Sequence, residues 1–397
     1  MKKPLTPMIA LVFVVLLSCS LAQAGSSYSR FGYGLLYLRD GVKAIAMGGT
    51  GLAISDSVTI FYLNPAALAS IRTTHIQGAA LYDRATMTLD NQSALFHEVN
   101  VNGLGILIPL KRGYAMAFGF QPYSQVNYEV SDSSTVDGKD LEQSLTGDGG
   151  LDVFYLALAS TIGPVQFGVT ADFYFGLISE TWRVNFSSGD LTSTDDRIST
   201  NFRGFGVHAG LQMNMKNWQW GLAAGTPVNL SGETRVDTRF DTDDNPKRAE
   251  SKLPFWLGLG MAYRPSVHWQ FAAEARVQQW GMMSKADLLG ASGVNNHILG
   301  FGLEFTPGSD RLRDGKGLHY RAGANYGRLP YREANGKTIP EWSLAAGFGV
   351  PFNRGASSVD FAVEWGKRGN SENLVQENIL RFSMSINGSE RWFQRRR

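Results

Sequence analysis

The chain has 397 residues with 37 basic and 35 acidic side chains, and a net charge of +2 gives no indication of a nucleic acid or other polyanionic partner. Cys19 is the single cysteine, which excludes a disulfide pair and a cysteine-based metal site. Glycine is abundant at 45 residues and proline sparse at 14, which favours packed, twisted strands over a disordered chain.

The first 24 residues are predicted to be a signal peptide. Two lysines precede an apolar stretch over residues 8–17, and Ala22-Gln23-Ala24 is a small-x-small cleavage sequence. The mature chain is therefore expected to begin at Gly25. Cys19 raises the alternative of a lipoprotein signal, which Leu17 disfavours because such signals prefer a small residue at its position.

The stretch "FYLNPAALASI", residues 61–71, is predicted to contain a short helix. Asn64 can cap its first free N–H groups, and Pro65 suits the first helical position. Ala66 and the alanines after it favour helix. This predicted helix precedes a long region in which apolar and polar residues alternate as in β-strands.

From Thr73 onward, apolar and polar residues alternate with the period of a β-strand. Val359, Phe361 and Val363, for example, alternate with polar residues such as Asp360 and thus share one side of a sheet. The mature chain has no run of 18 or more apolar residues, so it has no transmembrane helix, but a transmembrane barrel shows only this alternation. Fourteen runs are predicted, near 72–87, 97–110, 113–130, 149–162, 164–186, 195–214, 217–238, 250–264, 267–283, 294–306, 317–329, 339–351, 357–368 and 376–388.

Short and long connections alternate between these runs. This pattern is typical of an outer-membrane barrel, whose short turns face the periplasm and whose longer loops face outward. A soluble β-sandwich or propeller, the alternative fold, has no reason to place a long loop at every second turn; the long connection 306–317 is an exception to the alternation. The predicted short connections include Lys111-Arg112, Gly163, Lys216 and Pro265-Ser266, and the long ones include 131–148, 187–194 and 239–249.

Aromatic and charged residues fit the barrel interpretation. The nine tryptophans fall near predicted strand ends, where aromatic girdles of a membrane barrel would place them. Six charged residues share strand faces with serine, asparagine and glycine, and an arginine on the lipid face at mid-depth would cost about 2–4 kcal/mol. These faces are therefore predicted to line the lumen. The six residues are Glu274, Arg276, Arg321, Asp360, Glu364 and Arg381.

The sequence from Ala44 to Ile71 resembles the FadL-like family, outer-membrane transporters of long-chain fatty acids and other hydrophobic compounds. "PYSQVNY", residues 122–128, and the ending "RFSMSINGSERWFQRRR" resemble a Bacteroidetes-type branch of it. The resemblance implies an all-β fold, a 14-stranded antiparallel transmembrane β-barrel over 72–397. It also implies an N-terminal plug over 25–71, which contains the Asn64-Pro65-Ala66 turn and the short helix. The alternative is that Asn64-Pro65 only caps a periplasmic helix ahead of the first strand.

The third predicted strand carries Pro122, which cannot donate to a strand ladder. In the family, this strand is kinked inward and opens a gap in the wall, through which an apolar substrate leaves into the bilayer. Gly119, Pro122, Tyr123 and Ser124 are the residues at which we expect such a gap. The alternative is a bulge that only adjusts the curvature of the barrel.

No catalytic, cofactor-binding or metal-binding motif is present, and the six histidines have no ligand spacing. The resemblance implies passive uptake of hydrophobic molecules, with outer-membrane lipid and a hydrophobic small molecule as partners and a monomeric state. The predicted outer loops are shorter and more acidic than those that capture substrate in the family. A second function therefore stays open, that of a FadL-like assembly barrel such as those that hold cargo proteins in type IX secretion.

Overall fold

The computed structural model describes residues 25–37, 40–89, 92–110, 113–136, 139–186, 193–239, 245–308 and 317–390. The predicted signal peptide with Cys19, the turn at Lys111-Arg112 and Trp392 lie outside the described residues.

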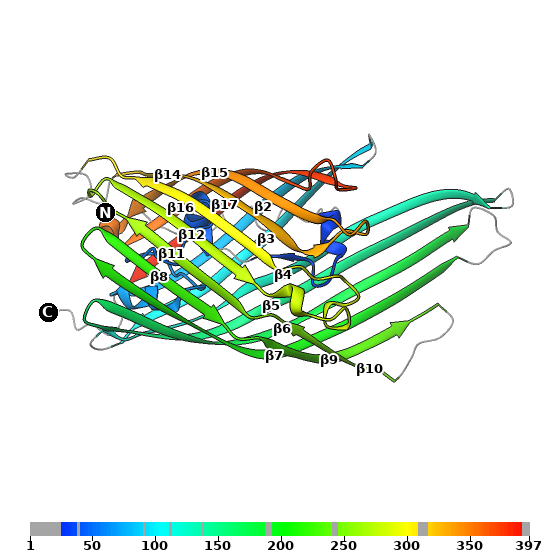
Figure 1. The fold of residues 1–397 in the computed structure, drawn as a ribbon, viewed down its shortest axis with the longest axis horizontal. Coiled ribbons are helices and arrows are strands. Elements are labelled where there is room, and N and C mark those ends of the chain that lie inside the picture. Colours follow the sequence, from blue (N-terminus) through cyan, green and yellow to red (C-terminus); the bar gives the residue numbers. More distant parts are fainter. Residues whose placement is uncertain are drawn as a thin grey trace, which may run out of the picture.

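Fourteen antiparallel strands close into a barrel within the described chain (Figure 1). β8 and β9 together make one barrel strand, as do β10 and β11, and β17 pairs with β2 to close the wall. The strands are β2 (Thr74–Leu89), β3 (Gln92–Pro109), β4 (Ala115–Val136), β5 (Lys139–Ile162), β6 (Val165–Phe186), β7 (Thr194–Met215), β8 (Trp218–Gly225), β9 (Val228–Asp237), β10 (Lys247–Leu253), β11 (Trp256–Tyr263), β12 (Trp269–Gln278), β13 (Asn296–Phe305), β14 (His319–Arg332), β15 (Thr338–Phe352), β16 (Ser357–Arg368) and β17 (Gln376–Glu390).

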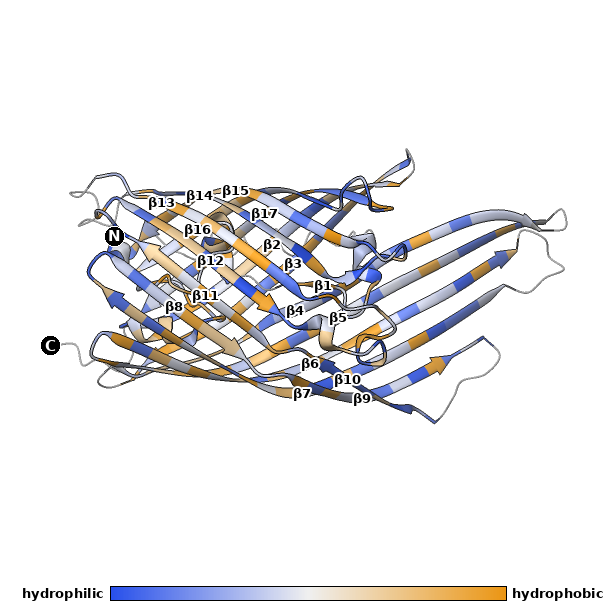
Figure 2. Ribbon diagram, viewed as in Figure 1, coloured by the Kyte–Doolittle hydropathy of each residue, from blue (hydrophilic) through white to orange (hydrophobic). Residues whose placement is uncertain are grey.

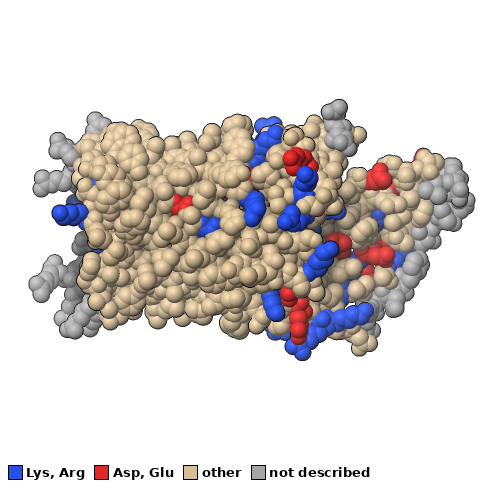
Figure 3. Space-filling model, viewed as in Figure 1, with Lys and Arg blue, Asp and Glu red and all other residues tan. Residues whose placement is uncertain are grey.

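The alternation in the sequence sets the two faces of the wall. In β6, Phe167 and Val169 are exposed on the outer face, while Gln166 and Thr170 are buried on the inner face. Hydrophobic residues are dense along the barrel strands (Figure 2), and few charged side chains interrupt the outer surface there (Figure 3). This apolar exterior is the surface that a transmembrane barrel presents to lipid. Among the described residues, no helix is both long and apolar enough to cross a membrane.

The two ends of the barrel differ. The short-turn end carries the connections at Gly163, at Lys216 and between Tyr263 and Trp269, and the opposite end is the long-loop end. At the long-loop end, strands β4 to β7, each 22 to 24 residues long, extend past the rest of the wall together with β9 and β10 (Figure 1). We call this extension the projecting sheet.

The predicted loop over residues 131–148 is wrong, because most of it is strand. β4 continues to Val136 and β5 begins at Lys139, and their pairing runs unbroken from Ser124↔Leu151 outward. The acidic and hydroxyl-bearing sequence is typical of a loop, but the ladder to the neighbouring strand keeps it extended.

The N-terminal plug lies inside the barrel (blue in Figure 1). It starts near the long-loop end with the 3-10 helix η1 (Ser27–Arg30) and the two-residue strand β1 (Leu35–Leu36). It continues through α2 (Gly41–Ala46) and the 3-10 helix η2 (Pro65–Ser70), in which most side chains are buried. The last plug residue before the wall is close to the short-turn end, where β2 begins at Thr74.

The connection between β12 and β13 folds inward and covers the lumen at the long-loop end. It contains the 3-10 helices η4 (Trp280–Met282) and η5 (Ala286–Leu288), and Trp280 and Leu288 are both fully buried. A further 3-10 helix, η6 (Asn353–Gly355), forms the turn between β15 and β16.

The tryptophans divide between the girdle and the lumen. Trp218, Trp269 and Trp365 are 40–50% exposed on the outer face, as an interfacial girdle requires. The prediction is wrong for Trp280, which is buried in the lumen, and for Trp256, whose ring lies 5.9 Å from that of the inward-facing His208. Position near a strand end does not say on which face of the wall a side chain lies.

Candidate functional site

The plug contacts the wall through inward-facing glycines. A Cβ atom on Gly210 of β7 would overlap the Asn64 side chain, and one on Gly168 of β6 would overlap the Pro65 backbone. The wall can therefore approach the Asn64-Pro65-Ala66 turn at backbone distance only because these positions lack side chains. Wall glycines likewise face the plug segment 46–53; they are Gly221, Gly258, Gly260, Gly300, Gly302, Gly323 and Gly347.

Asn64 joins the cap of η2 to two other parts of the molecule. Its Oδ1 accepts a hydrogen bond of 3.2 Å from the N–H of Ala66. Its Nδ2 donates to the carbonyl of Leu52 in the plug at 2.6 Å and to that of Leu211 in β7 at 3.2 Å. The residue is fully buried, so water cannot reach its polar atoms and these bonds supply their hydrogen-bond partners.

Glu274 holds the plug backbone from β12. Its Oε2 accepts hydrogen bonds from the N–H groups of Gly51 at 2.7 Å and Leu52 at 2.9 Å. Arg276 lies two residues further along the same strand face and pairs with the other carboxylate oxygen at 2.9 Å. Glu274 and Arg276 were predicted to face the lumen, and Glu274 has a partner there that the sequence did not indicate, the plug itself.

The other four predicted lumen charges face inward from the wall strands in two ion-pair clusters, in which Arg381 is partly buried and the other three are buried. Arg321 bonds Asp360 at 2.5 Å, and Arg381 bonds Glu364 at 3.1 Å. Each cluster includes a carboxylate that the sequence analysis did not select. Those carboxylates are Glu304, 2.6 Å from Arg321, and Asp83, 2.5 Å from Arg381.

A second polar anchor joins the plug segment just before η2 to strands β6 and β7. The imidazole of His208 lies between Asp172 Oδ2, at 2.6 Å from Nδ1, and the carbonyl of Tyr62, at 2.9 Å from Nε2. The Tyr62 hydroxyl donates to the other oxygen of Asp172 at 3.0 Å. The sequence gave no sign that Asp172 on β6 would pair with a histidine on β7.

Asp40 joins two segments of the plug by hydrogen bonds. Its Oδ1 accepts hydrogen bonds of 2.8 Å from the N–H groups of both Tyr62 and Leu63. Its Oδ2 has no hydrogen-bond partner, and Gly51 packs beside it. Burial raises the pKa of this carboxyl to about 7, although the two N–H groups favour the ionised form.

The wall divides between β3 and β4. Pairing of these strands runs from Pro109↔Ala115 to Leu104↔Phe120 and ends there within the described residues. Beyond this point, residues 92–103 of β3 pair only with β2, while β4 pairs with β5. We call this division the β3–β4 split.

The predicted kink residues lie at the start of the split. Gly119 is in the last paired section, where a Cβ would overlap the carbonyl of Leu104. Pro122 comes two residues after the last pair with β3, and since it has no N–H it cannot donate to a ladder. The register with β5 shifts between Pro122 and Ser124, so Tyr123 is an extra residue, a β-bulge. Ser124 then pairs with Leu36 of the plug.

Polar side chains bridge the split. Asn100 of β3 and Gln125 of β4 exchange two hydrogen bonds, of 2.8 and 3.1 Å. Asn127 of β4 donates to Glu98 of β3 at 2.8 Å. The hydroxyl of Tyr37 donates to Gln125 from the plug side at 2.6 Å. The two strands are thus joined here by side chains instead of by backbone hydrogen bonds.

An apolar cluster fills the lumen beside the split. Tyr123 projects inward from the bulge, and its ring meets that of Tyr174 edge-on at 5.2 Å. Tyr33 of the plug packs against Phe202 at 6.0 Å and Trp280 at 6.2 Å. The lumen is therefore apolar next to the split, and elsewhere apolar packing between plug and wall accompanies the polar anchors.

These features form a plugged barrel without a metal centre in the described part of the chain. Among the described residues, no three His, Cys, Asp or Glu side chains are grouped so as to hold a metal ion. The family model for BamG matches residues 1–397, the whole chain. The chain belongs to the BamG family. Among curated proteins, none matches the sequence.

Three solved structures illustrate the similarity of fold. One, the CymD monoaromatic hydrocarbon channel, shares 16% identity over 91% of this chain and 100% of its own, with a TM-score of 0.59. The Ralstonia pickettii toluene transporter TbuX and a Pseudomonas aeruginosa FadL homologue each share 13% identity over 89% of this chain and 99% of their own, with TM-scores of 0.60. The predicted FadL-like fold of this BamG-family chain is therefore confirmed.

Proposed function

We propose that the protein is an outer-membrane channel for passive uptake of hydrophobic small molecules, which leave sideways through the β3–β4 split. The observation that carries this proposal is the end of backbone pairing at Leu104↔Phe120, directly beside the apolar luminal cluster. A closed ladder holds a barrel wall together along its full height, whereas side-chain bridges can part without breaking strand pairing. The fold that the chain shares with a monoaromatic hydrocarbon channel and a toluene transporter supports the same function.

The projecting sheet carries apolar side chains toward the split. Val130, Leu145 and Trp182 lie in one row across β4, β5 and β6, on the same face as the buried luminal residues. Val130 is 40% exposed and Trp182 is 49% exposed. Towards the barrel, this face carries Glu180, which accepts hydrogen bonds from the Tyr128 hydroxyl and the Trp182 indole. Ile178 follows and packs against the luminal cluster around Tyr33 and Tyr123. A hydrophobic molecule on this face exchanges water for apolar contacts before it reaches the lumen.

In this proposal, the long-loop end faces outward and the short-turn end faces the periplasm, as in other outer-membrane barrels. The plug stays in place and closes the axial route. The hydrogen bonds among Asn100, Gln125, Asn127 and Glu98 open to release the molecule into the bilayer, where an apolar solute is more stable than in the periplasm. The proposed role is therefore transport and not catalysis.

A reversible crosslink across the split tests the release step. Asn100→Cys and Gln125→Cys together, joined by a short cleavable thiol crosslinker, should block uptake of a labelled fatty acid and of toluene, and cleavage should restore it. The matched control is Ile106→Cys with Phe118→Cys, a directly opposed pair in the section that is already joined by backbone bonds. This control should transport as the unmodified protein does.

Full uptake by the crosslinked Asn100/Gln125 variant would refute lateral release. Uptake by cells with the intact protein no faster than by cells without it would refute the channel function as a whole. The two outcomes are separable because the second is read without any crosslink.

One observation favours a second function, the assembly barrel. Within the described residues, the β4 backbone beyond Gln125 has a strand partner only on its β5 side, which leaves an edge at the long-loop end. Such edges accept an extended segment of another protein. A photo-crosslinking residue at Ser133 should then give one discrete protein adduct in intact cells; labelling of lipid alone would exclude this function.

A further inference from the structure

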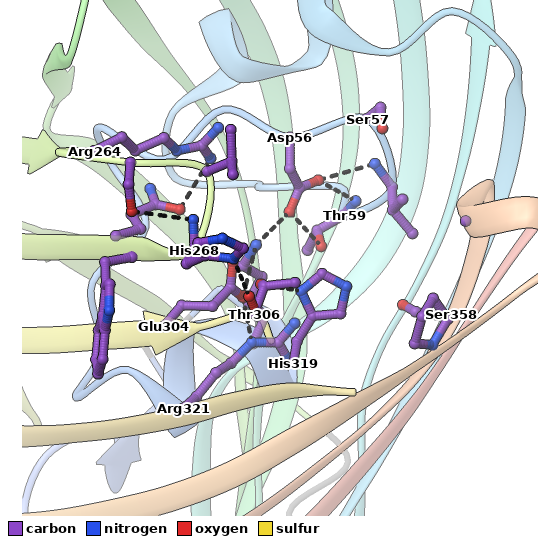
Figure 4. A pocket seen from close by; sticks show the side chains of 18 of the residues that line it. Asp56, Ser57, Thr59, Arg264, His268, Glu304, Thr306, His319, Arg321 and Ser358 are labelled. Carbon is purple, nitrogen blue, oxygen red and sulfur yellow. Dashed lines mark hydrogen bonds and ion pairs between the residues drawn. The ribbon is translucent and has the colours of Figure 1, made fainter. Parts of the chain in front are cut away.

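A polar cavity of about 570 Å³ lies at the short-turn end, between the plug and the rim of the wall (Figure 4). Its size is in the range that holds a small organic molecule, and it is several times larger than a single phosphate group requires. The plug contributes Lys43, Asp56 and Thr59, the wall contributes Gln270, Glu304, His319 and Arg321, and the rim contributes Lys216, Arg264 and His268.

The carboxylates Asp56 and Glu304 in this cavity are already paired with cationic side chains of the protein. Lys43 lies 2.9 Å from Asp56 and 3.3 Å from Glu304, and Glu304 in turn lies 2.6 Å from Arg321. Burial alone would raise the pKa of Asp56, but the Lys43 ammonium and the N–H groups of Val58 and Thr59 lower it to about 2. A cation would have to compete with these internal partners, so the cavity is not built for one.

The hydrogen-bond donors in this cavity, in contrast, are not all paired with a negatively charged acceptor. Arg264 Nη2 bonds only neutral acceptors, Gln270 Oε1 at 2.9 Å and the carbonyl of Ser55 at 3.4 Å. Neither Arg264 nor the exposed Lys216 has a carboxylate partner among the described residues. Gln270 is only 4% exposed, and its Nε2 has no hydrogen-bond partner. A buried donor without a partner is costly, and an acceptor on a ligand would remove this cost.

We propose that this cavity binds a small organic oxyanion, a carboxylate or phosphate group on a polar body. Arg264 and Gln270 Nε2 bind the oxyanion, and Lys216 supplies positive charge at the mouth. Guanidinium and ammonium groups are the usual recognition elements for such oxygens. The two histidines add polar surface, each with Nδ1 bonded to Thr306, at 2.8 Å for His268 and 2.9 Å for His319.

The ligand would also join the plug to the wall. Arg264 already contacts the plug through the Ser55 carbonyl, and Asp56 and Thr59 form the plug side of the same cavity. A bound oxyanion therefore stabilises the seated plug from the short-turn end. This site is distinct from the β3–β4 split and does not depend on the proposed transport function.

Calorimetry on the purified full chain in detergent tests the proposal, with chloride added so that ionic strength stays constant. The probes are inorganic phosphate, glycerol 3-phosphate and citrate. Binding of either organic anion supports the site, and the stronger one identifies phosphate or carboxylate as the recognised group. Binding of inorganic phosphate alone contradicts the organic class, and binding of none of the three overturns the site.

Three variants locate the binding. Arg264→Gln and Gln270→Glu should each weaken the preferred anion at least tenfold, since a hydrogen bond to a charged group is lost or a like charge is introduced. Lys216→Asn, which suits the positive φ of 48° at that turn, should weaken it several-fold. Arg72→Gln removes an exposed charge close to the start of β2, outside the cavity lining, and should change affinity by less than twofold. Equal weakening by Arg264→Gln and Arg72→Gln would overturn the site.

Discussion

Replacement of Glu274 by alanine should release the plug from the wall without removing any wall strand. The carboxylate accepts two hydrogen bonds from the plug backbone, at Gly51 and Leu52, and pairs with Arg276 behind it. Alanine removes all three contacts at once. The side chain points into the lumen, so the apolar outer surface stays unchanged.

The free energy lost in Glu274→Ala can be estimated from the type of contact that the carboxylate makes. A hydrogen bond to a charged group contributes about 1.5–3 kcal/mol, so the two bonds to the plug contribute about 3–6 kcal/mol if they act independently. Even the lower figure shifts the balance between seated and displaced plug by more than about 100-fold. Glu274→Gln keeps an acceptor oxygen without the charge and should give roughly half the free-energy change.

Planar-bilayer recordings measure the result. Glu274→Ala should show long-lived open events with increased small-ion conductance, because a barrel of this width without its plug leaves an aqueous channel. Asp83→Asn is the matched control: it removes a partly buried carboxylate from its arginine, Arg381, in a pair that bonds wall to wall. A folded Glu274→Ala protein that conducts no more than the control would refute the view that this carboxylate seats the plug.

Three more predictions concern the plug and the orientation of the barrel. Gly210→Val places a side chain where Asn64 lies, so it should lower the unfolding temperature and increase conductance; overpacking costs about 1–3 kcal/mol. The neutral form of Asp40 stabilises the fold below the unfolded pKa of 3.8, and this contribution is lost as pH rises to the folded value of about 7; Asp40→Asn should remove that part of the pH dependence in thermal unfolding. With the long-loop end outward, a membrane-impermeant maleimide should label Ser133→Cys in intact cells but leave Ser266→Cys unlabelled, and the reverse pattern would invert the barrel.

The strands could be predicted because each one buries a single face. Period-two alternation survives in β16 and β17 without interruption, and both were predicted within a few residues. The sequence was least informative at residues 131–148, where few side chains are buried on either face of the sheet. There, composition suggested a loop, although cross-strand hydrogen bonds alone are enough to extend the hairpin.

The candidate site was only half predictable. A charge on a wall strand must avoid lipid, so the positions of Arg321 and Arg381 in the lumen followed from the alternation. Their additional partners, Glu304 and Asp83, depend on register between strands, which one sequence does not give. The contact of Asn64 with the Leu211 carbonyl is even harder to predict from the sequence, because it joins residues 147 positions apart.

The anchors of the plug are unevenly distributed, and this decides which part of it can move. From Asp40 to Asn64, charged groups of the wall hold the plug, among them Glu274 and Asp172, which accepts a hydrogen bond from the Tyr62 hydroxyl. Next to the β3–β4 split, Tyr37 is held by a neutral hydrogen bond to Gln125 and by a backbone bond to Tyr123. Hydrogen bonds to charged groups are about twice as strong as neutral ones, so the segment at the split gives way first. The proposed lateral release requires this distribution, because the barrel then opens sideways at β4 while its axis stays closed to water.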